Sequence, residues 1–169
     1  MSRLEPLLER LAERPIGGYA RAWAGALPRD GKSIIASVAS AVGLNALGRE
    51  GDFQSVRPED AAVWLTLFAT QPLLHGGRSI PPTLIDDVSE SLEELGPDAR
   101  YFSKGSWQYT RRFKHYELVK YDNDWRASRH KLLFVSESEP LPPIDVIEDG
   151  GIIGVGLESA FIYWVEEDD

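Results

Sequence analysis

Residues 144–165, IDVIEDGGIIGVGLESAFIYWV, carry the strongest β-strand signal in this chain of 169 residues. β-branched and aromatic side chains dominate the stretch, and such residues favour the pleated surface of a sheet. The glycines of Asp149-Gly150-Gly151 supply the positive φ angles that a tight turn requires. The stretch therefore predicts a hairpin of residues 144–148 and 152–156, followed by a strand over residues 161–165.

Strand-like patterning begins further upstream, at Tyr101. In residues 107–121 apolar and polar residues alternate, but the apolar phase changes near Lys114-His115, which predicts a bulge or a break there. Residues 122–124 have the composition of a turn, and residues 131–136 have that of a further strand. The region from residue 100 onward is therefore expected to form an antiparallel sheet.

The first 99 residues instead have the apolar spacing of helices. Five helical segments are expected, which begin near Ser2, Tyr19, Asp30, Pro58 and Pro81. The second of them covers residues 19–27, and residues 61–69 within the fourth are apolar nearly all round, which is typical of a central core helix. Charged residues lie opposite the apolar faces of the first and last helices: Glu9, Arg10 and Glu13 in the first, and Asp86, Asp87, Glu90, Glu93 and Glu94 in the last.

Helices followed by strands predict an α+β fold, in which about five N-terminal helices pack on one side of a C-terminal antiparallel β-sheet. A folded chain of this length buries roughly 70% of the surface that its unfolded form exposes, so one core is sufficient. We therefore expect a single domain over residues 1–169, with a helical half at residues 1–99 and a β half at residues 100–169.

The composition excludes several kinds of functional site. The chain has no cysteine, so disulfides, thiolate zinc sites, iron–sulfur clusters and cysteine nucleophiles are excluded. Its three histidines lack the spacing of a metal site, and we expect neither a metal ion nor another cofactor. No apolar run approaches the roughly 18 residues of a membrane helix, so a cytoplasmic protein without membrane contact is expected.

Charge is distributed in blocks along the chain, which has 27 acidic and 18 basic residues and a net charge of −9. Residues 1–99 hold 14 acidic and 9 basic residues, residues 100–131 hold 3 and 9, and residues 132–169 hold 10 and none. One interpretation is that the basic and acidic blocks pair across neighbouring strands of one sheet. The other is that they form separate binding surfaces.

The acidic C-terminal block combines carboxylates with an aromatic strand, which is typical of a surface that docks a basic protein. Charge accelerates the encounter and opposes wrong partners, while an exposed tryptophan or tyrosine supplies the anchor that becomes buried on binding. The residues expected to contact the partner are Asp145, Glu148, Asp149, Glu158, Tyr163 and Trp164.

In size, acidity and the lack of catalytic motifs, the chain is similar to bacterial immunity proteins, which neutralise a cognate toxin that is often a nuclease with a basic cleft. The similarity covers no defined motif, so it implies no residue roles. It implies a non-enzymatic inhibitor of the antitoxin type, whose acidic and aromatic residues fill the active site of the toxin in place of its anionic substrate.

Two other functions stay open. Eight aromatic residues are interleaved with basic ones between Arg100 and Lys131, and this pattern is typical of proteins that bind single-stranded nucleic acid or nucleotides. The contacts would then come from Tyr109, Arg111, Arg112 and Lys114. A small enzyme would instead use His115 or His130 as a general base beside a carboxylate.

Overall fold

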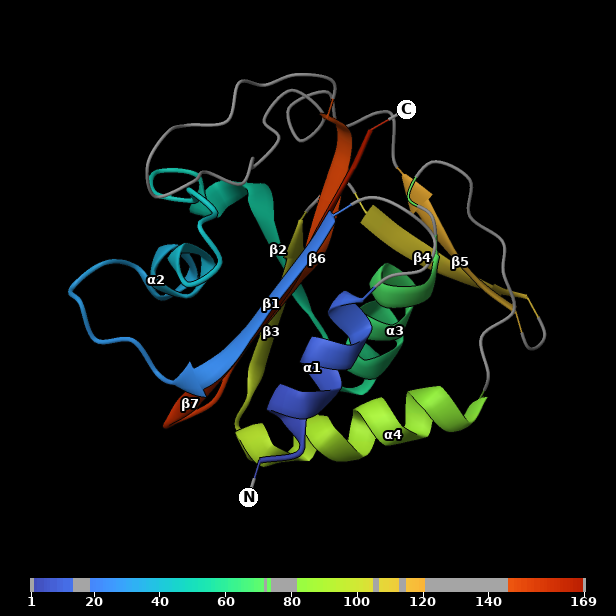
Figure 1. The fold of residues 1–169 in the computed structure, drawn as a ribbon, viewed down its shortest axis with the longest axis horizontal. Coiled ribbons are helices and arrows are strands. Elements are labelled where there is room, and N and C mark those ends of the chain that lie inside the picture. The colour runs from blue at the N-terminus through green and yellow to red at the C-terminus, as the bar shows by residue number, and fades with distance from the viewer. Residues whose placement is uncertain are drawn as a thin grey trace.

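A five-stranded antiparallel sheet with helices on both faces forms the centre of the computed structural model (Figure 1). The structure describes residues 2–13, 19–71, 73, 82–104, 107–112, 115–120 and 146–168. In spatial order the strands are β1 (Tyr19–Ala26), β7 (Ser159–Asp168), β6 (Val146–Val155), β3 (Arg100–Lys104) and β2 (Phe53–Val56). A separate two-stranded sheet contains β4 (Trp107–Arg112) and β5 (His115–Lys120).

The α-helices of the described residues are α1 (Leu4–Ala12), α2 (Ile34–Ser40), α3 (Ala61–Thr70) and α4 (Pro82–Leu92). Short 3₁₀ turns occupy Glu50–Asp52, Pro58–Asp60 and Glu93–Leu95. These helices and the antiparallel sheet confirm the predicted α+β fold.

β7 is an inner strand whose side chains are buried on both faces of the sheet. Phe161, Tyr163 and Val165 pack with α1, α3 and α4, whereas Ile162 and Trp164 pack with α2. Because successive side chains of a strand point to opposite faces, this run of apolar residues needs an apolar cover on each side. The expectation of helices on one side only is therefore wrong, since α2 covers the second face (Figure 1).

β1 corrects the prediction of a helix over residues 19–27. All eight of its residues pair with β7, from Tyr19 opposite Glu166 to Ala26 opposite Ser159. Three alanines of β1 pack on the α1 side of the sheet and Trp23 packs on the α2 side. The helix preference of alanine is a weak one, and pairing with β7 together with burial against α1 outweighs it.

β6 continues through Asp149-Gly150-Gly151, so the hairpin predicted there is wrong. Neither of these glycines has a positive φ angle. A Cβ atom at Gly151 would lie 2.0 Å from the backbone oxygen of Tyr163, so the glycine permits the close approach of β7. The chain reverses at residues 156–158 instead, where the N–H of Gly156 donates to the oxygen of Ser159 at 2.8 Å.

Gly151→Ala is expected to lower the free energy of unfolding by about 2–3 kcal/mol, because β7 must move away to admit the methyl group. Gly51→Ala is the matched control, since no atom lies within 4 Å of a Cβ built there. The control should change the free energy by less than about 1 kcal/mol. Urea unfolding followed by tryptophan fluorescence measures both variants, and equal costs would contradict the close packing of β6 on β7.

α3 confirms the predicted core helix, since residues 61–69 are all buried. α4 begins at Pro82, and the 3₁₀ turn after it closes at Gly96, whose φ angle is 91°. β2 is a strand inside the half that was expected to be helical.

β4 and β5 confirm the break predicted near Lys114-His115. Their backbones pair in antiparallel register, with Arg112 opposite His115. The strand predicted at residues 131–136 and the turn predicted at residues 122–124 lie outside the described residues.

Candidate functional site

Tyr163 and Trp164, predicted to be exposed aromatic anchors, are each 0% exposed. The Tyr163 hydroxyl donates a 2.8 Å hydrogen bond to the backbone oxygen of Leu11 in α1. The Trp164 ring packs on the other face of the sheet, with its centroid 5.7 Å from that of Phe53. The prediction of exposure is wrong because β7 is an inner strand covered on both faces.

Asp149, another predicted contact, forms a buried ion pair with Lys104 at the end of β3. The Lys104 side chain is 1% exposed and that of Asp149 is 0% exposed. Glu167 is also buried, and its Oε2 accepts a 2.7 Å hydrogen bond from the backbone N–H of Leu73. The basic and acidic blocks therefore meet within the sheet at this ion pair, and these carboxylates belong to the interior.

The other predicted contacts in the C-terminal block do not form one surface among the described residues. Glu158 is exposed in the turn between β6 and β7. Glu148 is placed by its backbone in β6, opposite Glu167, and Asp145 lies outside the described residues.

Of the segment predicted to bind nucleic acid, residues 107–112 and 115–120 form the β4–β5 hairpin, whereas residues 100–104 form β3 of the five-stranded sheet. In the register of the hairpin, Tyr109 stands opposite Leu118, Arg111 opposite Tyr116, and Arg112 opposite His115. Lys114 and His130 lie outside the described residues. The hairpin is a sheet of its own, so its strands do not pair with the acidic strands β6 and β7.

The start of α2 carries two carboxylates, each held by a serine hydroxyl. Ser33 caps the helix by accepting from the N–H of Ala36 at 3.3 Å, and its hydroxyl donates to Glu50 at 2.6 Å. Asp30, the expected start, accepts from the Ser37 hydroxyl and the Lys32 N–H instead. The Ser37 bond, with that from Lys32, lowers the pKa of Asp30, and the Ser33 bond lowers the pKa of Glu50. Two ionised carboxylates at this position oppose the binding of another anion.

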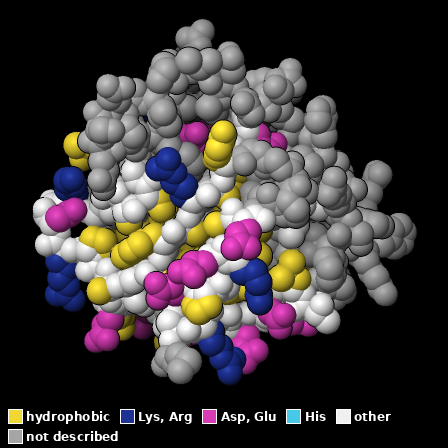
Figure 2. Space-filling view, in the orientation of Figure 1, with side chains coloured by type: hydrophobic (Ala, Val, Ile, Leu, Met, Phe, Trp, Pro, Cys, Tyr) yellow, Lys and Arg dark blue, Asp and Glu magenta, His cyan; other side chains and the backbone are white. Residues whose placement is uncertain are grey.

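A concentration of exposed carboxylates lies on α1, on α4 and on the 3₁₀ turn after α4. Residues 2–13 and 82–95 together hold eight acidic and two basic residues, all of them exposed. They are Glu5, Glu9, Glu13, Asp86, Asp87, Glu90, Glu93 and Glu94, with Arg3 and Arg10. Figure 2 shows acidic side chains gathered over both helices. We call this surface the acidic face.

Glu90 and Glu94 hold α1 against the end of α4. Glu94 accepts hydrogen bonds from the backbone N–H groups of Arg3 and Leu4 and from the Ser2 hydroxyl, the last at 3.0 Å. The first N–H groups of a helix lack partners within it and carry partial positive charge, so a carboxylate stabilises them. Glu90 forms an ion pair with Arg3. The other six carboxylates of the acidic face have no ion-pair partner in the part of the chain that the structure describes.

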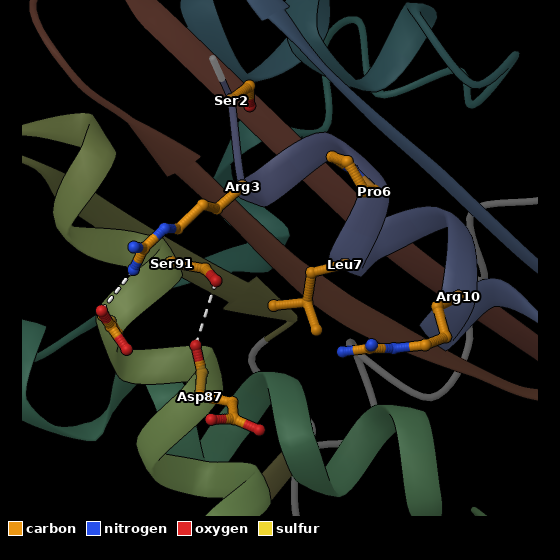
Figure 3. Close-up of a pocket in the computed structure, with 8 residues that line it drawn as sticks. Ser2, Arg3, Pro6, Leu7, Arg10, Asp87 and Ser91 are labelled. Carbon is orange, nitrogen blue, oxygen red and sulfur yellow. Dashed lines mark hydrogen bonds and ion pairs between the residues drawn. The ribbon is translucent and has the colours of Figure 1, made fainter.

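An open groove of about 420 Å³ lies between α1 and α4 (Figure 3). It is lined by Ser2, Arg3, Pro6, Leu7, Arg10, Asp87, Glu90 and Ser91. Leu7 points between the two helices, and Arg10 and Asp87 approach the groove from opposite sides. Small-molecule sites are enclosed and mostly apolar, so this open, charged groove is better suited to the side chains of a protein.

The described residues hold no group of three or more histidines and carboxylates placed to bind a metal ion. None of the helices within them combines the length and apolar character that crossing a bilayer requires. Comparison of the chain with protein-family models, with curated proteins and with solved structures finds no match.

Proposed function

We propose that this protein is a non-enzymatic binding module of the immunity or antitoxin type, and that its acidic face covers the basic active site of a cognate toxin. The observation that supports the proposal is the acidic face, where six exposed carboxylates have no ion-pair partner among the described residues. Such carboxylates suit a cleft whose ordinary substrate is an anion, because complementary charges speed association and disfavour other partners.

The groove between α1 and α4 is a depression in the acidic face, into which a side chain of the toxin can insert. Asp87 on one wall offers a carboxylate to an incoming cation, and Arg10 on the other offers a cation to an incoming carboxylate. The apolar atoms of Leu7 and Pro6 offer a contact for an aliphatic chain. Interfaces draw most of their energy from a few side chains seated in such depressions. The groove is therefore the expected centre of the contact, with the outer carboxylates as its rim.

The test is capture from native lysate by the tagged protein, at low and at moderate salt, with nuclease-treated and untreated samples in parallel. The proposal expects one basic protein in equimolar amount, which survives nuclease treatment and moderate salt. An equimolar amount of this chain should abolish the toxic activity of the captured protein. Capture of an acidic protein, or full activity in the complex, would contradict the proposal.

Glu9→Lys combined with Glu93→Lys is expected to weaken binding of the captured protein by about 10- to 100-fold, because the two new lysines repel the basic surface of that protein. Glu59→Lys combined with Glu158→Lys is the matched control, with the same change in net charge at exposed positions outside the acidic face. Titration calorimetry measures both. Equal losses in the two variants would show that net charge alone governs binding and would remove the acidic face as the site.

The β4–β5 hairpin supports a second candidate, the binding of single-stranded nucleic acid. Its pairing keeps Arg111 and Arg112 in a sheet separate from the acidic strands, with Tyr116 and His115 opposite them. Cations for phosphates and rings for bases are what such binding requires. Nucleic acid recovered without nuclease, and lost as salt rises, would favour this candidate over the toxin inhibitor. An enzyme that uses His115 or His130 stays a prediction.

A further inference from the structure

β1 forms one edge of the five-stranded sheet. Among the described strands its only neighbour is β7, with which all eight residues from Tyr19 to Ala26 pair in unbroken register. A strand paired on one side directs about half of its backbone N–H and C=O groups away from the sheet. These groups form a template for a further strand.

The sequence of β1 itself lacks the features by which proteins usually protect a sheet edge. It contains no proline and no bulge, and Arg21 is its one charged residue. Four alanines and one glycine leave its backbone accessible, because their side chains are small. β2, at the opposite edge, is only four residues long and is followed by Arg57-Pro58, as a protected edge should be. The two edges therefore differ in the protection that their sequences provide.

The surroundings of β1 indicate the chemistry of a strand that would pair with it. Glu5, Glu9 and Glu13 follow each other at intervals of four along α1 and so form one row on its exposed surface. Figure 2 shows a row of acidic side chains over α1, beside the strip of backbone and small side chains that β1 presents to the viewer. On the α2 side, the half-buried Trp23 ring lies over Gly25, 2.7 Å from where a Cβ would stand.

We propose that β1 receives an extended basic segment of the partner as a sixth strand of the sheet, an inference that rests on the proposed function. Side chains at alternate positions of such a strand face α1 and recur at intervals of about 6.7 Å. The glutamates of the row recur every four helical residues, about 6 Å. A segment with lysine or arginine at alternate positions therefore sets one cation against each glutamate, while its remaining side chains cover Trp23.

A second copy of this chain is the less suitable occupant. In two-fold pairing of one β1 with another, the two α1 helices lie on the same face of the joined sheet, so the two glutamate rows meet across the axis. Like charges in that arrangement repel. The net charge of −9 on each chain adds to the repulsion at long range.

The probe is an acetylated and amidated octapeptide in which lysine alternates with valine. Two analogues carry the same charge, one N-methylated at every lysine and the other at every valine. All N–H groups of one residue type point to one edge of the added strand, so one analogue should lose binding and the other should keep it. Binding by charge alone would affect both analogues equally, and that result would overturn the inference.

Amide hydrogen exchange, resolved by NMR, locates the bound peptide on the full chain. At alternate residues between Tyr19 and Ala26, exchange should slow at least tenfold with the peptide. Glu5→Lys, Glu9→Lys and Glu13→Lys together should abolish this protection, whereas Asp86→Lys, Asp87→Lys and Glu93→Lys together, with the same change in charge, should leave most of it. Unchanged exchange in β1 would overturn the inference, and so would concentration-dependent protection of β1 without peptide, which would identify a second copy as the occupant.

The same exchange measurement on the complex with the captured toxin separates this inference from the proposed function. Toxin that binds the acidic face while β1 exchange stays unchanged overturns the sixth strand and leaves the proposed function standing. If the peptide protects β1 but the chain inhibits no captured protein, the pairing of β1 with a basic strand stands and the proposed function is overturned.

Discussion

Trp164→Ala is expected to lower the free energy of unfolding by about 3–5 kcal/mol, the range for removal of a large buried aromatic side chain. The Trp164 ring is fully buried beside Phe53, on the face of β7 that packs with α2. Alanine leaves a cavity between this face and α2, and close-packed surroundings collapse only partly into such a space. Loss of partner binding by this variant would therefore arise from unfolding, in contrast to the role predicted from the sequence.

Urea unfolding measures the cost, with Leu157→Ala as the control because the Leu157 side chain is 71% exposed. The control should cost less than about 0.5 kcal/mol. Trp164→Phe should cost less than the alanine variant, because it keeps an aromatic ring and removes a buried indole N–H that has no hydrogen-bond partner among the described residues. A Trp164→Ala protein as stable as the parent would contradict the burial of β7.

Lys104→Met is expected to destabilise the protein by about 3–5 kcal/mol, because it leaves the Asp149 carboxylate buried without its ammonium partner. Lys104→Met combined with Asp149→Leu removes both charges and should recover most of the loss, since a buried ion pair adds little net stability over apolar side chains of similar size. The recovery separates the cost of removing the ammonium partner of Asp149 from the cost of altered packing.

The exposed ion pair of Arg3 and Glu90 provides the comparison. Their side chains are 66% and 60% exposed, so Arg3→Met should cost less than about 1 kcal/mol. Thermal or urea unfolding of the three variants at neutral pH measures the differences. A double variant that is no more stable than Lys104→Met would mean that Asp149 is held chiefly by other groups.

The sequence predicts the elements whose signals are local. Residues 61–69 are apolar all round and form the buried helix α3, and the composition of residues 161–165 identifies a strand. The same five residues are also apolar at successive positions, a pattern that a sheet covered by helices on one side only does not explain. Apolar side chains at both odd and even positions require cover on both faces, and α2 supplies the second cover.

The errors occur where a distant segment decides the conformation. Residues 19–26 favour a helix in isolation, and only β7, far along the chain, makes them a strand. Gly151 is needed for the close approach of Tyr163 and Trp164, and the local sequence does not distinguish this role from that of a glycine in a hairpin turn. The sequence shows the charges of the acidic face on two separate helices. These helices form one surface because of contacts such as that of Glu94, which caps α1 from 90 positions away. Spacing along the sequence does not encode that contact.

The position of β7 between β1 and β6 also sets an order on folding during synthesis. The Tyr163 hydroxyl bonds to Leu11, 152 positions earlier, and β1 pairs with no described strand other than β7. As the chain leaves the ribosome, β1 therefore has no native strand partner among the described residues until residues 159–168 have been made. Loop closure over such a separation is slow, and β1 is unpaired along both edges throughout that interval. Nascent chains of this protein are accordingly expected to depend on chaperones that shield residues 19–26 until residues 159–168 have emerged.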